Sequence, residues 1–262
     1  MKYGLDREHG GVYTCVNRDG SLMDTTKSVW FQGRFGFIAA YAYNNIEKNP
    51  QWLAASKSCI DFIEAHCFDT DGHMFFEVTE DGKPLRKRRY VFSEGFAAIA
   101  MAEYALATGE KEYAKKALDI FKRTLHFLNT PGFLEPKYLP TLPSKGHSIT
   151  MILINTASRI RMVIDDPSLT EQIDTSIAAL RKYFIHPEFK ALLEMVGPDG
   201  EFIDTCNGRV INPGHCIETA WFIMEEAKYR NWDKDLLQLA LQILDWSWEW
   251  GWDKEFGGII NF

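Results

Sequence analysis

A histidine within a short polar motif is the residue of this sequence best suited to acid–base chemistry. His215 follows Asn212-Pro213-Gly214 and precedes Glu218 by three residues. An unperturbed imidazole has a pKa of about 6.5, so both its acid and its base forms are populated near neutral pH. If a helix begins near Pro213, Glu218 projects from the same face as His215 and could orient the imidazole or bind a hydroxyl group. The alternative is a core histidine whose hydrogen bonds are satisfied.

The cysteines offer no comparable chemistry. Cys216 is adjacent to His215, but neighbouring residues of a helix point about 100° apart and cannot form a nucleophile–base pair. The remaining cysteines, at 15, 59, 67 and 206, lack the close paired spacing of a zinc site or a disulfide framework. We therefore expect reduced cysteines and no metal site.

An internal repeat organises the elements that must position these side chains. The segment 6–13 reappears as 253–260, with an acidic residue and two glycines at corresponding places, and 69–76 is a degenerate copy. Asp-Gly pairs recur at 19–20, 81–82 and 199–200 between short β-prone runs, as they would in hairpins. The spacing of the copies indicates a repeat of about 62 residues.

Helices fill the space between the predicted hairpins. Apolar residues recur there with helical spacing. They predict eight helices, at about 26–47, 51–67, 90–107, 110–129, 147–164, 168–185, 214–230 and 233–250. Each repeat is therefore a hairpin followed by two helices.

Repeated helix pairs favour an all-α fold that closes on itself. Each pair needs neighbours to cover its apolar faces, and pairs of this size commonly close as an (α/α)6 toroid or barrel. Six repeats would need roughly 360 residues. We therefore expect residues 1–262 to form a single (α/α) barrel domain that is truncated at both ends, with short β-hairpins between the helix pairs.

Composition excludes several classes of partner. The chain is 46% hydrophobic, as a globular core requires, and its net charge of -7 argues against nucleic acid as a partner. No apolar stretch is long enough to span a bilayer and no signal-peptide core is present, so we expect no membrane partner and a cytoplasmic location. The aromatic content of 14% suits a protein that stacks rings on sugars.

Four segments together carry a resemblance to a known family. They are KSVWFQGR at 27–34, YVFSEGF at 90–96, NPGHCIETAWF at 212–222 and GGIINF at 257–262. In this order and at these separations they resemble the N-acylglucosamine 2-epimerase family, also called renin-binding protein, along essentially the whole chain. The resemblance implies an (α/α)6 barrel that interconverts N-acetylglucosamine and N-acetylmannosamine, a step of sialic acid metabolism. Related branches epimerise cellobiose or isomerise mannose.

The resemblance also implies a site. Inverting C2 of an aldose requires removal of a proton next to the C1 carbonyl and its return on the opposite face. His215 matches one member of the family's histidine pair, and the second member is expected beyond Phe262. Arg34 matches an arginine whose guanidinium would stabilise the enediolate, and Glu218 supports His215. A buried ion pair between Arg34 and Glu94 is the alternative reading of these two side chains.

Further side chains are expected to contact the sugar, or else to act as hydrogen-bonding fixtures of the core. Trp30 lies four residues before Arg34 and so on the same helical face. The set of predicted substrate contacts consists of Trp30, Gln32, Glu94, Asn155, Tyr138 and His147. The other histidines, including His73 and His186, are expected in solvent.

The expected ligands follow from the same resemblance. No cofactor is required, although ATP could bind as an activator that is not consumed. The basic run 83–89 is then either a contact for its phosphates or, as such runs usually are, a solvated face. The substrate is a small amino sugar, and a homodimer is compatible with the family. Two rival hypotheses remain: an (α/α)6 glycoside hydrolase that uses Glu94 and Glu218 as its carboxylates, and a non-catalytic protein.

Overall fold

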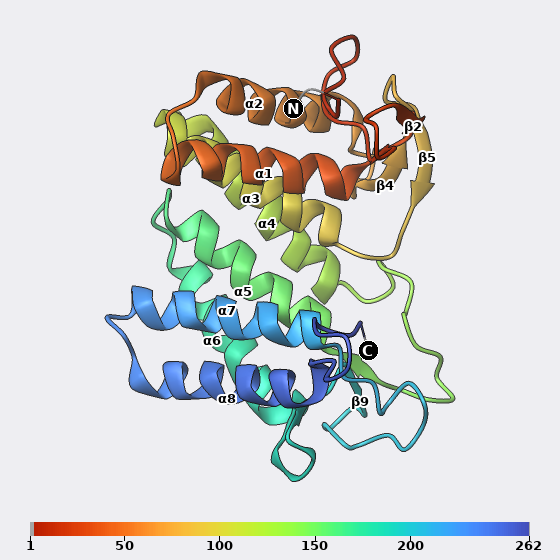
Figure 1. Cartoon of the computed structure of the whole chain (residues 1–262), viewed down its shortest axis with the longest axis vertical. Coiled ribbons are helices and arrows are strands. Elements are labelled where there is room, and N and C mark those ends of the chain that lie inside the picture. The colour runs from red at the N-terminus through yellow and green to blue at the C-terminus, as the bar shows by residue number, and fades with distance from the viewer. Residues whose placement is uncertain (1–2, 262) are drawn as a thin grey trace. The chain divides into compact units, whose positions relative to one another are not determined.

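The computed structural model describes residues 3–261, so that residues 1, 2 and 262 lie outside the description. The chain is mainly helical and forms two compact units (Figure 1). Unit 1 comprises Met1–Lys137 and Arg159–Asp166, and unit 2 comprises Tyr138–Ser158 and Pro167–Phe262. The expectation of one barrel domain truncated at both ends stays a prediction. Among the described residues, none of the helices has the length and apolar composition that a bilayer crossing requires.

The described part of unit 1 is built on four helices. These are α1 (Val29–Asn45), α2 (Pro50–His66), α3 (Phe92–Thr108) and α4 (Lys111–Asn129). Helix α1 packs against α2 and α3, and α3 packs against α4 (Figure 1). The predicted helices are confirmed in this region to within three residues. Local signals explain their ends, since Asn49 caps α2 through its side chain and Gly109 ends α3 with a left-handed φ of 75°.

The contact between α1 and α3 depends on a missing side chain. A Cβ atom built on Gly33 of α1 would lie 2.6 Å from the backbone carbonyl carbon of Phe96 in α3. One turn further along α1, a Cβ atom on Gly36 would lie 3.3 Å from Cβ of Ala100. Glycine at 33 therefore lets the two backbones approach each other closely, which sets where the exposed face of α1 lies.

Short strands join the helices of unit 1. A hairpin consists of β1 (Cys15–Val16) and β2 (Leu22–Asp24). A three-stranded antiparallel sheet has the order β3 (Lys27–Ser28), β4 (Phe75–Val78), β5 (Pro84–Lys87). The Asp-Gly turns at 19–20 and 81–82 connect the strands of these hairpins, as predicted.

A buried lysine ties the loops of unit 1 together. Lys27 is 0% exposed, and its Nζ donates hydrogen bonds to Asp6 Oδ2 at 2.7 Å and to the carbonyl oxygens of Gly10 and Glu80 at 2.8 Å. The ammonium also lies 4.2 Å from the ring centroid of Phe62. All three hydrogen atoms of the ammonium therefore have acceptors, which offsets the cost of burying its charge.

The described residues of unit 2 also form four α-helices, α5 (His147–Arg161), α6 (Pro167–Ala179), α7 (Pro213–Tyr229) and α8 (Lys234–Gly251). The last turn of α5 is assigned to unit 1. Helix α7 packs against α8 (Figure 1). The helix predicted to reach residue 185 is interrupted, because Leu180–Phe184 form a π-helix. Short π-helical segments within helices are frequent at functional sites.

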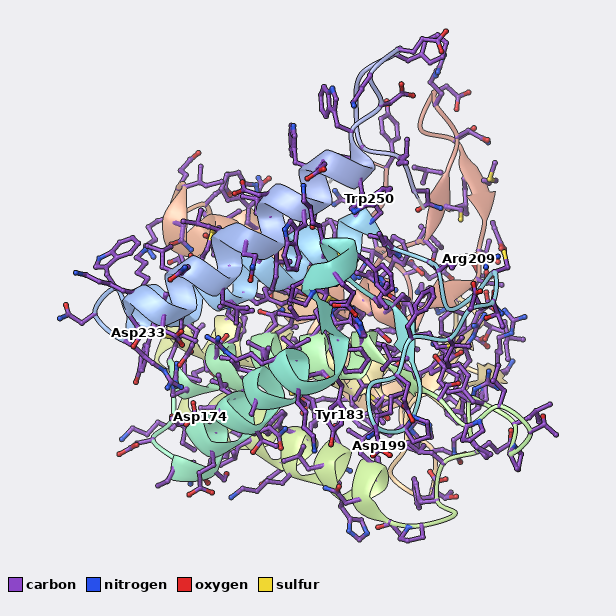
Figure 2. The ribbon with its side chains drawn as sticks, turned by 90° about the horizontal axis from the view of Figure 1, so that it is seen from below. Asp174, Tyr183, Asp199, Arg209, Asp233 and Trp250 are labelled. Atoms are coloured by element: carbon purple, nitrogen blue, oxygen red, sulfur yellow. The ribbon has the colours of Figure 1, made fainter. Side chains whose placement is uncertain are left out.

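Two short ladders complete unit 2. Strand β6 (Lys145–Gly146) pairs with β9 (Met195–Val196), and β7 (Ile185–His186) pairs with β8 (Ala191–Leu192), with a 3-10 turn at Pro187–Phe189 between the latter two. The Asp-Gly pair at 199–200 forms the predicted turn, closed by a hydrogen bond from Gly197 N to Glu201 O. This turn lies against Tyr183 (Figure 2). The strand before the turn, β9, pairs with β6 and so does not form the predicted hairpin.

The hairpins of the sequence repeat recur in the structure. Isolated antiparallel bridges join Leu5 to Val12, Phe68 to Met74 and Trp252 to Ile259. In the first and last copies, an aspartate at the start of the loop accepts hydrogen bonds from two backbone N–H groups that follow it. The two glycines of each of these copies have positive φ angles, which explains why glycine occurs at both places.

Candidate active site

Three side chains capable of proton exchange meet in unit 2. One ligand atom of each of His147, Glu194 and His215 lies within 4.8 Å of the others. Glu194 Oε2 is 3.0 Å from His215 Nδ1 and 3.5 Å from His147 Nδ1. The carboxylate therefore lies between two imidazoles, at the place where the sequence predicted His215 as an acid–base group.

Backbone structure brings these side chains together. Gly146 pairs with Met195 in the β6–β9 ladder, and the hydrogen bond from His147 N to Glu194 O continues that pairing by one step at 3.1 Å. His215 lies in the first turn of α7, where its N–H donates to the capping side chain of Asn212 at 3.1 Å. The β6–β9 ladder and the first turn of α7 thus bring the side chains of His147, Glu194 and His215 together.

Thr219 links the two histidines on the side away from the carboxylate. Its hydroxyl donates to the backbone carbonyl of His215 at 2.8 Å and lies 2.8 Å from His147 Nε2. Because the single hydroxyl hydrogen is used towards the carbonyl, Nε2 of His147 must be the donor in the second contact. Phe184, from the π-helix, packs edge-on against the His147 ring with the centroids 5.9 Å apart.

The charge of Glu194 determines which nitrogen of His215 can act as a base. Burial alone would raise the pKa of Glu194, but the imidazoles of His147 and His215, whose protonated forms turn an N–H group towards the carboxylate, outweigh it and lower the pKa to about 2. The ionised carboxylate is an acceptor only, so His215 Nδ1 donates its hydrogen to it. The lone pair of a neutral His215 is therefore on Nε2.

Glu194 was missed by the sequence analysis, which assigned the supporting carboxylate to Glu218. Glu218 is partly buried on α7, but the carboxylate that contacts the imidazole is that of Glu194. Glu194 belongs to none of the four family segments, and its partners are separated from it by 21 and 47 residues of sequence.

The other predicted contacts in unit 2 are partly or largely buried, with Tyr138 in the connection before α5 and Asn155 on α5.

Two of the predicted residues share a surface of unit 1. Trp30 packs edge-on against Phe76, Phe92 and Phe96, with ring centroids 5.1, 5.3 and 5.9 Å apart. Arg34 is exposed, and its guanidinium lies 4.3 Å from the centroid of the Phe96 ring. The alternative of a buried Arg34–Glu94 ion pair is therefore wrong, because Arg34 is held by an aromatic face and not by a carboxylate.

Gln32 has a different role from the one predicted. Its side chain is 0% exposed, and it accepts a hydrogen bond from Val12 N at 2.8 Å while donating one to Val12 O at 2.7 Å. Both polar ends are thus used by the backbone of the first repeat hairpin. We correct the prediction of a substrate contact, because the amide of Gln32 fixes that hairpin to α1.

Glu94 forms a buried pair with a histidine that was expected in solvent. His73 is 4% exposed, and its Nδ1 lies 2.6 Å from Glu94 Oε1, while its Nε2 donates to Arg88 O at 2.8 Å. Burial lowers the pKa of His73, but the hydrogen bond to Glu94 outweighs this and raises it. Glu94 Oε1 also accepts from Met74 N, whereas Oε2 is buried with no hydrogen-bond partner among the described residues.

His186, also expected in solvent, is only 9% exposed.

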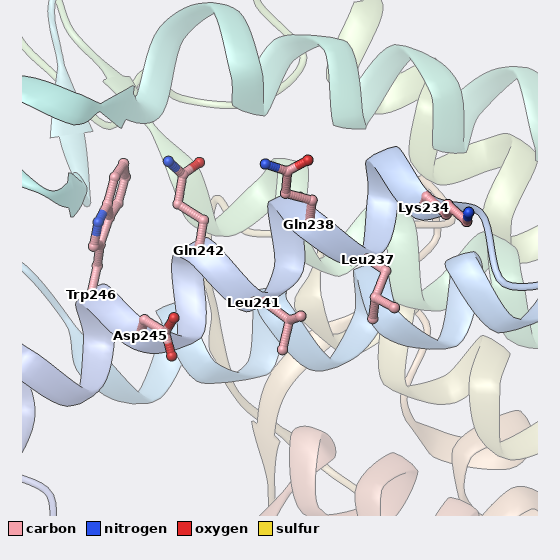
Figure 3. A pocket seen from close by; sticks show the side chains of 7 residues that line it. All are labelled: Lys234, Leu237, Gln238, Leu241, Gln242, Asp245 and Trp246. Carbon is pink, nitrogen blue, oxygen red and sulfur yellow. The ribbon is translucent and has the colours of Figure 1, made fainter.

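Two hollows lie apart from the Glu194 cluster, and His73 of the Glu94–His73 pair lines one of them. One of about 300 Å³ in unit 1 is lined by part of the basic run, Lys87–Arg89, together with Asp71, His73 and Phe133–Glu135. Lys87 there is paired with Asp69 and Asp71. The other, of about 420 Å³, runs along one face of α8 between Lys234 and Trp246 (Figure 3). It contains no histidine, and so it lacks the acid–base group of the first cluster.

The chain matches a known family over nearly its whole length. A sequence profile of the family described as N-acylglucosamine 2-epimerase (GlcNAc 2-epimerase) matches residues 11–262. The N-acylglucosamine 2-epimerase of Rattus norvegicus is 29% identical over 271 residues, which cover 100% of this chain and 64% of that protein. The chain thus spans somewhat less than two thirds of the length of this relative.

Solved structures share the fold. A cellobiose 2-epimerase from Bacillus thermoamylovorans B4167 has a TM-score of 0.82 and 20% identity, over 96% of this chain and 68% of the other. A D-mannose isomerase has a TM-score of 0.79 and 18% identity, over 100% and 70%. At these identities the likeness concerns the fold alone, and it confirms the predicted helical class of (α/α)6 type.

Proposed function

Because the chain belongs to the N-acylglucosamine 2-epimerase family, we propose that it is part of a sugar 2-epimerase. Its substrate is the open-chain form of N-acetylglucosamine or N-acetylmannosamine, and the two are interconverted by proton removal and return at C2. The observation that carries this proposal is the contact of 3.0 Å between Glu194 Oε2 and His215 Nδ1. It supplies an oriented imidazole of the kind that the reaction needs.

His215 is the proposed base. With its Nδ1 hydrogen held by Glu194, its Nε2 takes the proton from C2 and becomes part of an imidazolium that the carboxylate stabilises. The enolate that results accepts a proton at C2 on its opposite face from a second acid–base group. The family resemblance predicts that group outside residues 1–262.

Roles for residues of unit 1 are proposed from the family resemblance alone. Arg34 stabilises the negative C1 oxygen of the enolate, and its position over the Phe96 ring restricts the guanidinium before substrate arrives. Trp30, which packs on the same ring, offers an aromatic surface to the sugar. Glu94 Oε2 is a buried acceptor with no partner among the described residues, which suits a sugar hydroxyl.

The remaining contacts are proposed from their positions within unit 2. Asn155 and Tyr138 supply polar groups to the sugar, and Glu218 binds a hydroxyl one turn beyond His215. His147 was predicted as a substrate contact, but its side chain is 0% exposed, so we correct that prediction and propose that His147 only supports Glu194 and His215. The mannose and cellobiose branches remain the alternatives for substrate, and they would share the same base.

Isotope exchange tests the proposal. The protein is incubated in deuterated water with N-acetylglucosamine, and separately with cellobiose and mannose. Deuterium at C2 of N-acetylglucosamine, together with the appearance of N-acetylmannosamine, is the expected result. Release of a shorter sugar from a glycoside without C2 exchange would instead identify a glycoside hydrolase. The 262-residue chain is assayed beside a longer protein, called full-length below, that carries the second acid–base group predicted beyond Phe262, and we expect exchange from the longer protein only.

An activator and a cellular setting complete the proposal. ATP, bound without being consumed, would place its phosphates near Arg88 and Arg89, which line the hollow of unit 1. Catalysis itself needs no cofactor. The proposed substrate belongs to sialic acid metabolism in the cytoplasm, and a homodimer is the assembly proposed from the family. Initial rates with and without ATP, and the mass of the protein in solution, test these points.

A further inference from the structure

His147 is a buried histidine with one unsatisfied nitrogen. Its side chain is 0% exposed, and Nδ1 has no hydrogen-bond partner among the described residues. This nitrogen lies 3.5 Å from Glu194 Oε2, beyond the usual length of a hydrogen bond. A buried polar atom without a partner is costly, so the arrangement calls for an additional group between His147 and the carboxylate.

The protonation of His147 points to the nature of that group. Because Nε2 donates to Thr219 Oγ1 at 2.8 Å, the lone pair of the neutral ring is on Nδ1 and faces Glu194. A hydrogen bond on the outer nitrogen is the arrangement that fixes the tautomer of metal-binding histidines. A lone pair that faces a carboxylate is repelled by it, unless a cation lies between the two.

The donor atoms match the ligands of a transition metal. His147 Nδ1, His215 Nδ1 and Glu194 Oε2 are two imidazole nitrogens and one carboxylate oxygen, with neighbouring separations of 3.0 and 3.5 Å. Metal–ligand bonds of about 2.0–2.2 Å at tetrahedral angles place ligand atoms roughly 3.3–3.5 Å apart. We propose that His147, Glu194 and His215 form a binding site for Zn²⁺ or a chemically similar divalent transition metal. Two nitrogen donors disfavour Mg²⁺ and Ca²⁺.

Binding of the metal would switch off the proposed base. The metal takes the position of the hydrogen on His215 Nδ1, and that proton is released or moves to Nε2. A neutral ring bound through Nδ1 carries its remaining hydrogen on Nε2, so the lone pair that would accept the C2 proton is lost. This inhibition rests on the proposed epimerase function, whereas the metal site itself does not. The scattered cysteines predicted no metal site, and the three ligands proposed here, at 147, 194 and 215, are distant in sequence and form no motif.

Cobalt spectroscopy tests the site directly. The wild-type protein is titrated with Co²⁺, and separately with Zn²⁺ in a calorimeter. We expect one equivalent of Co²⁺ to give the visible absorption of a nitrogen- and oxygen-ligated ion, and Zn²⁺ to displace it. His147→Leu and Glu194→Gln should each abolish this stoichiometric signal. The matched control is His186→Gln, which removes the histidine of another His–Glu pair in unit 2 and should leave the titration unchanged.

A variant that retains all three ligands keeps the proposal testable if a ligand variant fails to fold. Thr219→Val keeps the volume of a fully buried side chain but removes the hydroxyl that orients His147, so metal affinity should fall by about 10- to 100-fold. Absence of a stoichiometric signal in the wild type, or its persistence in both ligand variants, would overturn the proposal. Epimerisation that proceeds equally with Zn²⁺ and with a chelator would overturn the inhibition only. Loss of all epimerase activity, with the cobalt signal intact, would count against the proposed function alone.

Discussion

Thr219 connects two histidines of unit 2, because its hydroxyl donates to the carbonyl oxygen of His215 and its hydroxyl oxygen accepts a hydrogen bond from His147 Nε2, each at 2.8 Å. Glu194 connects the same histidines through their Nδ1 atoms. The four residues form a closed ring of contacts in which the orientation of each imidazole depends on a partner. The proposed base is therefore positioned by side chains that lie outside its own sequence motif.

Replacement of Glu194 by glutamine should remove the base without removing the sugar site. The amide can donate to His215 Nδ1, which shifts the imidazole hydrogen to Nε2 and occupies the nitrogen that must accept the proton. We expect kcat of the full-length enzyme to fall by about 10²- to 10⁴-fold, with KM nearly unchanged. Steady-state rates in both directions measure this. The control is Glu218→Gln, which should raise KM more than it lowers kcat; a Glu194→Gln enzyme with wild-type kcat would contradict the proposed role.

Removal of the Arg34 charge should affect catalysis far more than folding. Arg34→Met keeps the length of the side chain, and because Arg34 is exposed the free energy of unfolding should change by less than about 0.5 kcal/mol. The rate of C2 deuterium exchange should fall by about 10²- to 10³-fold. Arg123→Met is matched to it, since Arg123 is also exposed with its guanidinium near a phenylalanine ring, that of Phe68. Equal effects of the two variants on exchange would disprove the assignment.

A methyl group at position 33 should disturb the packing of α1 on α3. The Cβ atom of Gly33→Ala would lie 2.6 Å from the backbone of Phe96, so one helix must shift. We expect a loss of about 1–3 kcal/mol in the free energy of unfolding, measured by urea denaturation. Gly4→Ala provides the comparison, because no atom lies within 4 Å of its added Cβ. A Gly33→Ala protein as stable as Gly4→Ala would show that the two helices can separate freely.

The ion pair of Asp6 with Lys27 should make stability depend on acid pH. Burial opposes ionisation of Asp6, but the hydrogen bond from Lys27 and two backbone N–H groups outweigh it and lower its pKa. A lowered pKa in the folded state stabilises the protein above the unfolded value of about 3.9, and this contribution is lost as pH falls through the lower folded value. Urea denaturation at pH 7 and at pH values below 4 measures the loss.

The variant Asp6→Asn identifies the source of that pH dependence. It leaves the buried ammonium of Lys27 without its carboxylate, and we expect a cost of about 3–5 kcal/mol at pH 7. The difference from the wild type should shrink as pH falls below 4. Asp19→Asn is the control, because Asp19 is an exposed turn residue, also with a lowered pKa, that makes no contact with a buried charge. A constant difference between wild type and Asp6→Asn at all pH values would rule out the ion pair as the cause.

The sequence by itself determined the helices, the repeat and the family. Apolar periodicity, caps and breakers act within a few residues, so eight helices could be predicted close to their observed bounds among residues 3–261. The repeated hairpin was visible for the same reason, since its glycines at 10–11 and 257–258 are required locally by positive φ angles. His215 was identified from its own motif, because Asn212 and Pro213 begin the helix that carries it.

Only the tertiary structure decided which side chains act on one another. Glu194 and not Glu218 contacts His215, because the β6–β9 ladder brings residues 147 and 194 together. Gln32 became a fixture of the core because the hairpin at Val12 folds onto α1. The carboxylate of Glu94 pairs with His73 across 21 residues. Such contacts depend on strand pairing and helix packing between distant segments, and no local pattern of residues records them.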